Sequence, residues 1–161
     1  MAVGDIWLQT GRNRHPFEEI RHLLEHKDLL FGNLETALSE TGERAQKHHV
    51  IASPPEAARY LADAGFDLLS VANNHSVDLG AEGLTNTLRT LESRGILPIG
   101  AAASPNRQEP IILEKNGIVI GFSGYTTGRT VFSGGASVTR LGEEDIIADI
   151  ASLAGRCDHI A

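Results

Sequence analysis

Short apolar runs alternate with amphipathic stretches along residues 1–100. The apolar runs predict strands at 3–8, 28–32, 66–72 and 96–100. Apolar positions that recur every three or four residues predict helices over 16–26, 54–64 and 81–94. This alternation is typical of an α/β protein, in which a mainly parallel sheet is covered by flanking helices.

Local signals mark the ends and the buried sides of these helices. Ser53 is expected to cap the second helix, with Pro54 in its first position and Glu56 completing a capping box. Gly65 is expected to end that helix, because glycine readily adopts the left-handed conformation found at helix ends. The third helix is expected to bury the leucines on one of its faces, Leu84, Leu88 and Leu91.

The pattern changes in the last third of the chain. Two apolar segments, 111–114 and 118–122, flank Asn116-Gly117, which predicts a β-hairpin and therefore a mixed sheet. The stretch 126–140 is rich in Gly, Thr and Ser and is expected to be a loop, and 157–161 is expected to begin a further strand. A last helix is predicted over 143–154, with a core stripe of Ile146, Ile147, Ile150 and Leu153.

The composition favours a single globular domain over residues 1–161. Hydrophobic side chains make up 41% and charged ones 22%, which excludes a disordered or low-complexity chain. One cysteine excludes an internal disulfide framework, and the net charge of −7 disfavours nucleic acid as a partner. No apolar run approaches the roughly 18 residues of a membrane helix, so no membrane segment is expected and localisation is not readable here.

Polar side chains gather where the predicted strands end. They form three groups along the chain: Asp5, then Asn33 and Glu35, then Asn73, Asn74, His75 and Asp78. Because the carboxyl ends of parallel strands meet at one edge of a sheet, we expect these groups to lie close together. Carboxylates, an imidazole and amide oxygens suit divalent metals such as Mn, Fe, Zn or Mg. The residues therefore predict a metal or catalytic site at this edge.

Each of these residues also has an ordinary structural interpretation. Asp5 and Asp78 can cap turns, and asparagines at strand ends are common turn residues. Glu35 can be a solvated loop acid, and a single histidine such as His75 is more often structural than catalytic. On the residues alone both interpretations stay open, although the joint occurrence favours a site more than any one residue does.

Three segments carry a family resemblance. They read Gly4-Asp5-Ile6, Phe31-Gly32-Asn33-Leu34-Glu35-Thr36 and Ala72-Asn73-Asn74-His75-Ser76-Val77-Asp78-Leu79-Gly80. Together they resemble the bacterial capsule-synthesis family CapA/PgsA, which is associated with poly-γ-glutamate and belongs to the calcineurin-like metallophosphoesterase superfamily. The resemblance implies half of a four-layer αββα sandwich, with a mixed, mainly parallel sheet and flanking helices.

The resemblance implies metal ligands in each segment. Asp5 matches the acid that binds the first metal in the superfamily. In the second segment Glu35 is expected as the charged ligand with Asn33 as its partner, or the assignment is reversed. Asn74 matches the ligand that offers an amide oxygen.

The third segment also supplies the catalytic pair that the resemblance implies. His75 matches a catalytic histidine that would protonate the leaving oxygen or stabilise charge on the phosphoryl group. Asp78 would orient His75 through a hydrogen bond, or it would hold the turn. The implied reaction is metal-assisted phosphoester hydrolysis, in which two divalent ions clamp the phosphate and activate water.

The chain also departs from the family pattern. Histidine motifs of the type His-Trp-Gly and Gly-x-His-x-His are absent, and Trp7 stands where many phosphoesterases have a histidine. The chain therefore resembles the amino-terminal half of a family member, truncated at its C-terminal side, and the missing half or another chain would complete the fold. We expect exposed apolar surface where that half would pack, and no activity from this chain alone.

Two functions from different classes follow. The first is a CapA-like protein of capsule or poly-γ-glutamate biosynthesis, with a metal-dependent phosphoesterase-type site that is incomplete in this chain. The second is a non-catalytic component of envelope assembly that binds an anionic polymer or partner proteins. Family members are often associated with the cell envelope. His75→Ala would abolish the first function and spare the second.

Overall fold

The first sheet contains the four strands that the sequence predicts for residues 1–100. The computed structural model describes residues 1–8, 15–127 and 135–161. Its four-stranded sheet has the order β1-β2-β5-β6, and all neighbouring strands are parallel. The strands are β1 (Ala2–Ile6), β2 (Phe31–Leu34), β5 (Leu68–Ser70) and β6 (Leu97–Ile99).

The helices between these strands cover one face of the sheet. They are η1 (Glu18–Ile20), α1 (Arg21–Leu24), η2 (Pro55–Ala57), α2 (Ala58–Ala64) and α3 (Gly80–Ser93). Strands laid down in sequential order through right-handed crossovers place every crossover on the same side of a sheet. Accordingly, Leu24, Leu61 and Leu84 from the helices share one buried cluster with Leu34 and Leu69 from the strands. The predicted inner face of α3 is confirmed, because all three of its leucines are buried.

The predicted hairpin forms a second sheet instead of extending the first. Strands β8 (Ile111–Lys115) and β9 (Ile118–Phe122) are antiparallel, and β11 (His159–Ile160) pairs with β9 in parallel, in the order β11-β9-β8. Asn116 and Gly117 have φ angles of 53° and 78°, the conformation that a tight hairpin turn requires. The mixed character therefore belongs to this second sheet, while the first sheet is wholly parallel.

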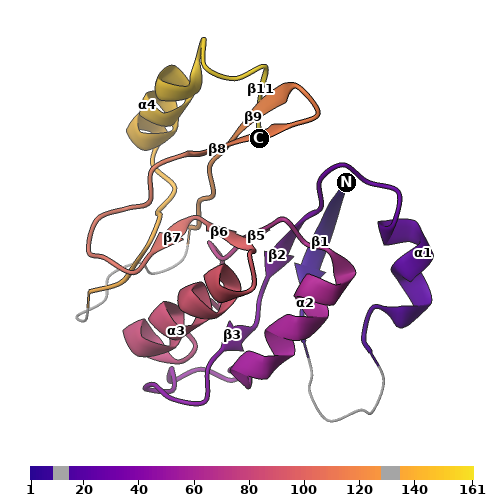
Figure 1. The fold of residues 1–161 in the computed structure, drawn as a ribbon. Coiled ribbons are helices and arrows are strands. Elements are labelled where there is room, and N and C mark those ends of the chain that lie inside the picture. The colour runs from indigo at the N-terminus through magenta and orange to yellow at the C-terminus, as the bar shows by residue number, and fades with distance from the viewer. Residues whose placement is uncertain (9–14, 128–134) are drawn as a thin grey trace.

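The two sheets pack face to face and helices cover both outer sides. Leu68 and Ile99 of the first sheet share a buried cluster with Phe122 of β9. On the other face of β9, a Cβ added to Gly121 would lie 2.8 Å from the Leu153 side chain of α4 (Glu143–Leu153), so this helix packs directly on the strand at Gly121. Figure 1 shows α4 beyond the hairpin, on the side away from α2 and α3. The layers are α, β, β and α, which confirms the predicted fold class.

Two short strand pairs were not predicted. Strands β3 (Ala37–Leu38) and β4 (Ala52–Ser53) are parallel, and they hold both ends of the polar segment between them. Strands β7 (Ala101–Ala102) and β10 (Ser137–Val138) are antiparallel. The second pair lies partly within the predicted loop over 126–140, of which residues 128–134 fall outside the described structure.

The predicted cap of the second helix is wrong, whereas its predicted end is confirmed. Ser53 belongs to β4, and its Oγ donates a hydrogen bond to the Leu8 carbonyl at 2.8 Å. The hydroxyl is therefore engaged by a distant strand end, and the helix begins after Pro54 without a side-chain cap. Gly65 ends α2 with a φ of 78°.

The predicted core stripe of the last helix is confirmed at Leu153 and wrong at Ile147 and Ile150. The buried residues of α4 are Asp149 and Leu153, whereas Ile147 and Ile150 are 59% and 48% exposed. Asp149 faces inward because polar groups from other segments bind its carboxylate. Ile118 of β9 and Ile160 of β11 are also exposed, to 46% and 44%. In the described part of the chain, no helix has the length and apolar character needed to cross a membrane.

Candidate functional site

The sheet register brings the first two predicted groups of polar residues together. Asp5 on β1 is paired with Asn33 on β2, and Asn33 is paired with Ser70 on β5. Paired residues of neighbouring strands point to the same face of a sheet, so Asp5 and Asn33 are side by side. The third group follows β5 directly, at the same edge.

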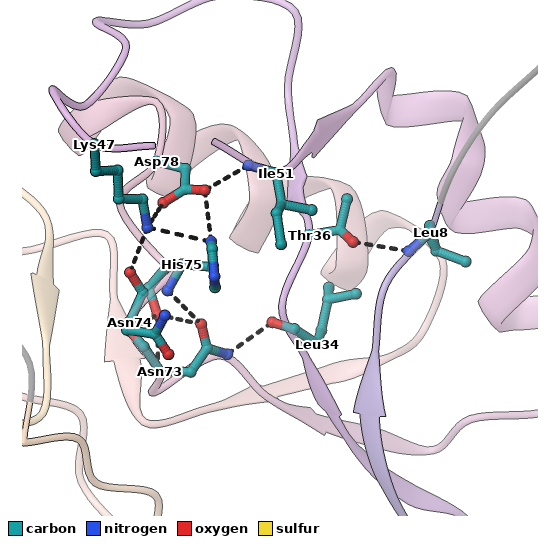
Figure 2. Close-up of polar contacts among 10 residues, drawn as sticks. Leu8, Leu34, Thr36, Lys47, Ile51, Asn73, Asn74, His75 and Asp78 are labelled. Atoms are coloured by element: carbon teal, nitrogen blue, oxygen red, sulfur yellow. Dashed lines mark hydrogen bonds and ion pairs between the residues drawn. The ribbon is translucent and has the colours of Figure 1, made fainter. Parts of the chain in front are cut away.

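Hydrogen bonds connect this row to the turn that contains His75. Asn33 Nδ2 donates to Asp5 Oδ1 at 2.8 Å, and Asn73 Nδ2 donates to Asn33 Oδ1 at 2.9 Å. Asn73 Nδ2 also donates to the Leu34 carbonyl at 2.8 Å, while Asn73 Oδ1 accepts the His75 backbone N–H at 2.9 Å (Figure 2). Four of the polar residues from three strand ends therefore form one connected set.

Asp78 lies at the far end of the turn and is fully buried. Its Oδ2 lies 2.8 Å from His75 Nδ1 and accepts the Ile51 backbone N–H at 2.6 Å. The Asp78 side chain is 0% exposed, and that of His75 is 11% exposed. The sequence left two roles open for Asp78, and contacts of both kinds are present, since the carboxylate meets the imidazole and also holds the backbone of residue 51.

Lys47 joins the site from the polar segment between β3 and β4. Its ammonium forms an ion pair with the buried Asp78 carboxylate and donates to the Asn74 carbonyl at 2.8 Å (Figure 2). It also lies 3.2 Å from His75 Nδ1. Sequence reasoning missed Lys47, because a single lysine in an irregular segment carries no local signal that it will meet an aspartate 31 positions later.

Glu35 and Asn74 stand apart from this connected set. The Glu35 backbone N–H donates to the Ile6 carbonyl at 3.0 Å, which places the residue beside the end of β1 with its side chain partly exposed. Asn74 is exposed, and its backbone carbonyl, not its amide, is the group that Lys47 contacts. Within the described residues, neither the Glu35 carboxylate nor the Asn74 amide joins the hydrogen bonds among Asp5, Asn33 and Asn73.

The donor groups of this site do not complete a metal centre. Among the described residues, no three or more His, Cys, Asp and Glu side chains gather where they could hold an ion. The amide oxygens of Asn33 and Asn73 already accept hydrogen bonds, from Asn73 Nδ2 and the His75 N–H. A divalent ion at this edge would therefore need ligands beyond those that the described residues bring together.

A second buried carboxylate lies at the opposite end of the molecule, on α4. Arg107 donates to both oxygens of Asp149, at 2.9 and 2.7 Å, and the Tyr125 hydroxyl donates to it at 2.6 Å. Burial alone would raise the pKa of Asp149, but the hydrogen bonds from Arg107 and Tyr125 outweigh it and hold that pKa below its ordinary value. Burial and the bond to Asp149 raise the pKa of Tyr125. This cluster holds α4 against the segments that contain Arg107 and Tyr125.

Together, the α/β/β/α layers and the polar strand ends define a layered α/β protein with a candidate site at the edge of its parallel sheet, and comparison with known proteins identifies its family. Residues 1–154 match the family of bacterial capsule synthesis proteins PGA_cap, and the chain belongs to this family. The family resemblance seen in the sequence is thereby confirmed.

Curated relatives agree with this assignment. The capsule biosynthesis protein CapA of Bacillus anthracis is 27% identical over 153 residues, which cover 86% of this chain and 36% of that protein. The PGA biosynthesis protein CapA of Bacillus subtilis is 27% identical over 114 residues, which cover 68% of this chain and 30% of that protein. The chain thus spans about a third of the length of these two relatives.

A solved structure shows the same fold. The 5'-nucleotidase precursor from Thermus thermophilus aligns with a TM-score of 0.51 and 17% identity, covering 88% of this chain and 28% of that one. At this identity the likeness concerns the fold alone.

Proposed function

We propose that this chain acts in the biosynthesis of a bacterial capsule polymer such as poly-γ-glutamate, and that its polar strand ends form part of a phosphoesterase-type site. Family membership supports the biosynthetic role. The main support for the site is that Asp5, Asn33 and the His75–Asp78 pair lie together at one edge of the parallel sheet.

The contacts of His75 support its role as the proton-carrying group. Because Nδ1 faces Asp78, Nε2 is the ring nitrogen left to hold or give a proton to a phosphoester oxygen. Asp78 is the residue that orients the ring, and the backbone N–H of Ile51 holds Asp78 in place. A single imidazole held in this way can protonate a leaving group or stabilise charge on a phosphoryl group.

A divalent cation at this edge is also part of the proposal. We propose Asp5, Asn33, Glu35 and Asn74 as the share of ligands that this chain contributes to a Mn, Fe, Zn or Mg site. The remaining ligands would come from outside the described residues or from another chain. The substrate would then be a phosphoester or an anionic polymer.

The isolated chain provides the first test of this proposal. We expect residues 1–161 to bind Mn²⁺ weakly and to hydrolyse no p-nitrophenyl phosphate, because the described ligand set is incomplete. Metal content after dialysis and release of p-nitrophenol are the measurements. Robust turnover by this chain would contradict the proposal that its site is incomplete.

A genetic experiment tests the biosynthetic role. Deletion of the gene in its host is expected to abolish the capsule polymer, and the wild-type gene is expected to restore it. A gene encoding His75→Ala is expected not to restore the polymer, whereas one encoding His22→Ala is, because His22 is exposed and lies on the short helix α1. Unchanged polymer after deletion would contradict the role in biosynthesis.

A second function is favoured by one observation. Among the described residues, no three His, Cys, Asp or Glu side chains lie together where they could hold a metal ion. The chain would then be a non-catalytic component of envelope assembly, and this edge of the sheet would bind an anionic polymer or partner proteins. In that case the His75→Ala gene would restore the polymer as well as the wild type does. The two functions therefore give opposite results in the same strain.

A further inference from the structure

Backbone groups fix the orientation of the Asn73 amide. The His75 N–H can only donate, so the Asn73 atom that lies 2.9 Å from it is the oxygen. The Leu34 carbonyl can only accept, so the Asn73 atom that lies 2.8 Å from it is the nitrogen. Exchanging the two atoms would place donor against donor and acceptor against acceptor, and would break both bonds.

This orientation fixes the next amide in turn. Because Asn73 Nδ2 also faces Asn33 at 2.9 Å, the Asn33 atom at that contact must be its oxygen. The Asn33 nitrogen is then the atom that meets Asp5 Oδ1, at 2.8 Å. The assignment of each amide therefore follows from a neighbour whose donor or acceptor character is certain.

The bonds run in a single direction. They lead from the His75 N–H to Asn73, from Asn73 to Asn33, and from Asn33 to the Asp5 carboxylate. Hydrogen bonds aligned in this way polarise one another, and this chain ends on a charged acceptor. It joins the turn after β5 to β1 through β2.

We infer that Asn33 and Asn73 are positioning residues, which fix the Asp5 carboxylate relative to His75. In this arrangement Asn33 donates from its amide nitrogen to Asp5 and accepts from Asn73 at its oxygen, so it links the Asp5 carboxylate to the turn that contains His75. The positioning role of Asn33 and Asn73 in catalysis rests on the proposed function, because it presumes that Asp5 and His75 act in one site. The hydrogen-bond chain itself is a property of the protein without metal or substrate.

The first test is spectroscopic and uses the metal-free protein in a chelating buffer. Asp5→Asn keeps an acceptor oxygen and removes the charge at the end of the chain of bonds. We expect it to shift the NMR signals of the Asn33 and Asn73 side-chain amides and of the His75 backbone N–H. Asp63→Asn removes the same charge from a side chain that is 59% exposed, and should leave those signals in place. An unmoved His75 N–H in Asp5→Asn would overturn the inference.

A double-mutant cycle is the second test. Asp5 and Asn73 do not bond to each other directly, and Asn33 lies between them. Members of one hydrogen-bond network couple, so Asp5→Ala and Asn73→Ala together should depart from additivity by about twofold or more in the unfolding equilibrium constant. Asp63→Ala combined with Asn73→Ala should be additive. Additivity of the first pair would overturn the inference, and so would equal coupling in both pairs.

The failure of this inference is distinguishable from failure of the proposed function. Both tests use the chain without metal or substrate, so a strain that still makes polymer after deletion of the gene leaves their results untouched. Conversely, a strain that loses the polymer, combined with an unmoved His75 signal in Asp5→Asn, would refute the positioning role and retain the biosynthetic one.

Discussion

Two aspartates are buried among the residues that the structure describes, and their surroundings differ. Asp78 is 0% and Asp149 3% exposed. Asp149 meets both terminal nitrogens of Arg107 and the Tyr125 hydroxyl, so that hydrogen-bond donors face both of its carboxylate oxygens. Asp78 meets Lys47, the Ile51 backbone N–H and the His75 imidazole. The second ring nitrogen of His75, Nε2, makes no hydrogen bond to the described residues.

The difference shows that a buried carboxylate can either hold two segments together or orient another side chain. The planar guanidinium of Arg107 binds both oxygens of Asp149 at once, which gives a rigid clamp between α4 and the segment before β8. Lys47 is a point charge that neutralises Asp78 and leaves the second oxygen to orient His75. The Asp149 cluster holds the fold together, whereas the Asp78 cluster presents a chemical group at the end of a sheet.

The largest effect is expected for Asp78→Asn. The change removes the charge that Lys47 neutralises inside the protein, and we expect a loss of about 3 kcal/mol in the free energy of unfolding. Urea denaturation followed by circular dichroism measures it. Asp145→Asn is the control, since Asp145 is 49% exposed and should change stability by less than about 0.5 kcal/mol. Equal effects of the two variants would refute the buried ion pair.

A smaller effect is expected for Asp149→Asn, about 2 kcal/mol at neutral pH, from the loss of charged hydrogen bonds. Arg107 is 29% exposed and lies 3.5 Å from Asp145, so its charge can find another partner or water when Asp149 is neutralised. A loss greater than that of Asp78→Asn would reverse the comparison between the two clusters.

The effect of Asp149→Asn should also depend on pH, and this is the smallest change. Because the folded state holds the pKa of Asp149 below its ordinary value, its carboxylate stabilises the protein above roughly pH 4 and loses this contribution as the pH falls through the folded-state pKa. The stability difference between wild type and Asp149→Asn should therefore shrink in acid. Urea midpoints from neutral pH downwards measure it, and a difference that widens below pH ~4 would have the wrong sign.

Local signals predicted much of the fold. The turn at Asn116-Gly117, the end of α2 at Gly65 and the leucine face of α3 depend on neighbouring residues, and all three are confirmed. Ser53 failed as a cap because a distant strand end, Leu8, binds its hydroxyl. The isoleucines of α4 point outward because Arg107 and Tyr125, far away in sequence, draw Asp149 inward. The spacing of apolar residues along a helix cannot predict polar contacts with residues that are distant in the sequence.

The candidate site was predictable in its location and less so in its connections. Parallel pairing brings Asp5 beside Asn33, and the turn after β5 brings His75 to the same edge. Asn73 and Asn74 are equivalent in the sequence, and only the geometry of the turn directs the first inward and leaves the second exposed. The sequence alone therefore could not predict that Asn73, and not Asn74, connects the strand ends.

The central claim is that the edge with Asp5, Glu35 and His75 is the cation-facing functional surface of this chain. A titration of the chain with paramagnetic Mn²⁺, followed by NMR, tests it most directly, because signals near the bound ion broaden first. We predict that the signals of Asp5, Glu35 and His75 broaden before those of Tyr125 and Asp149. Broadening that begins in the acidic first turn of α4, at residues 143–145, or that leaves the strand ends unaffected, would contradict the claim.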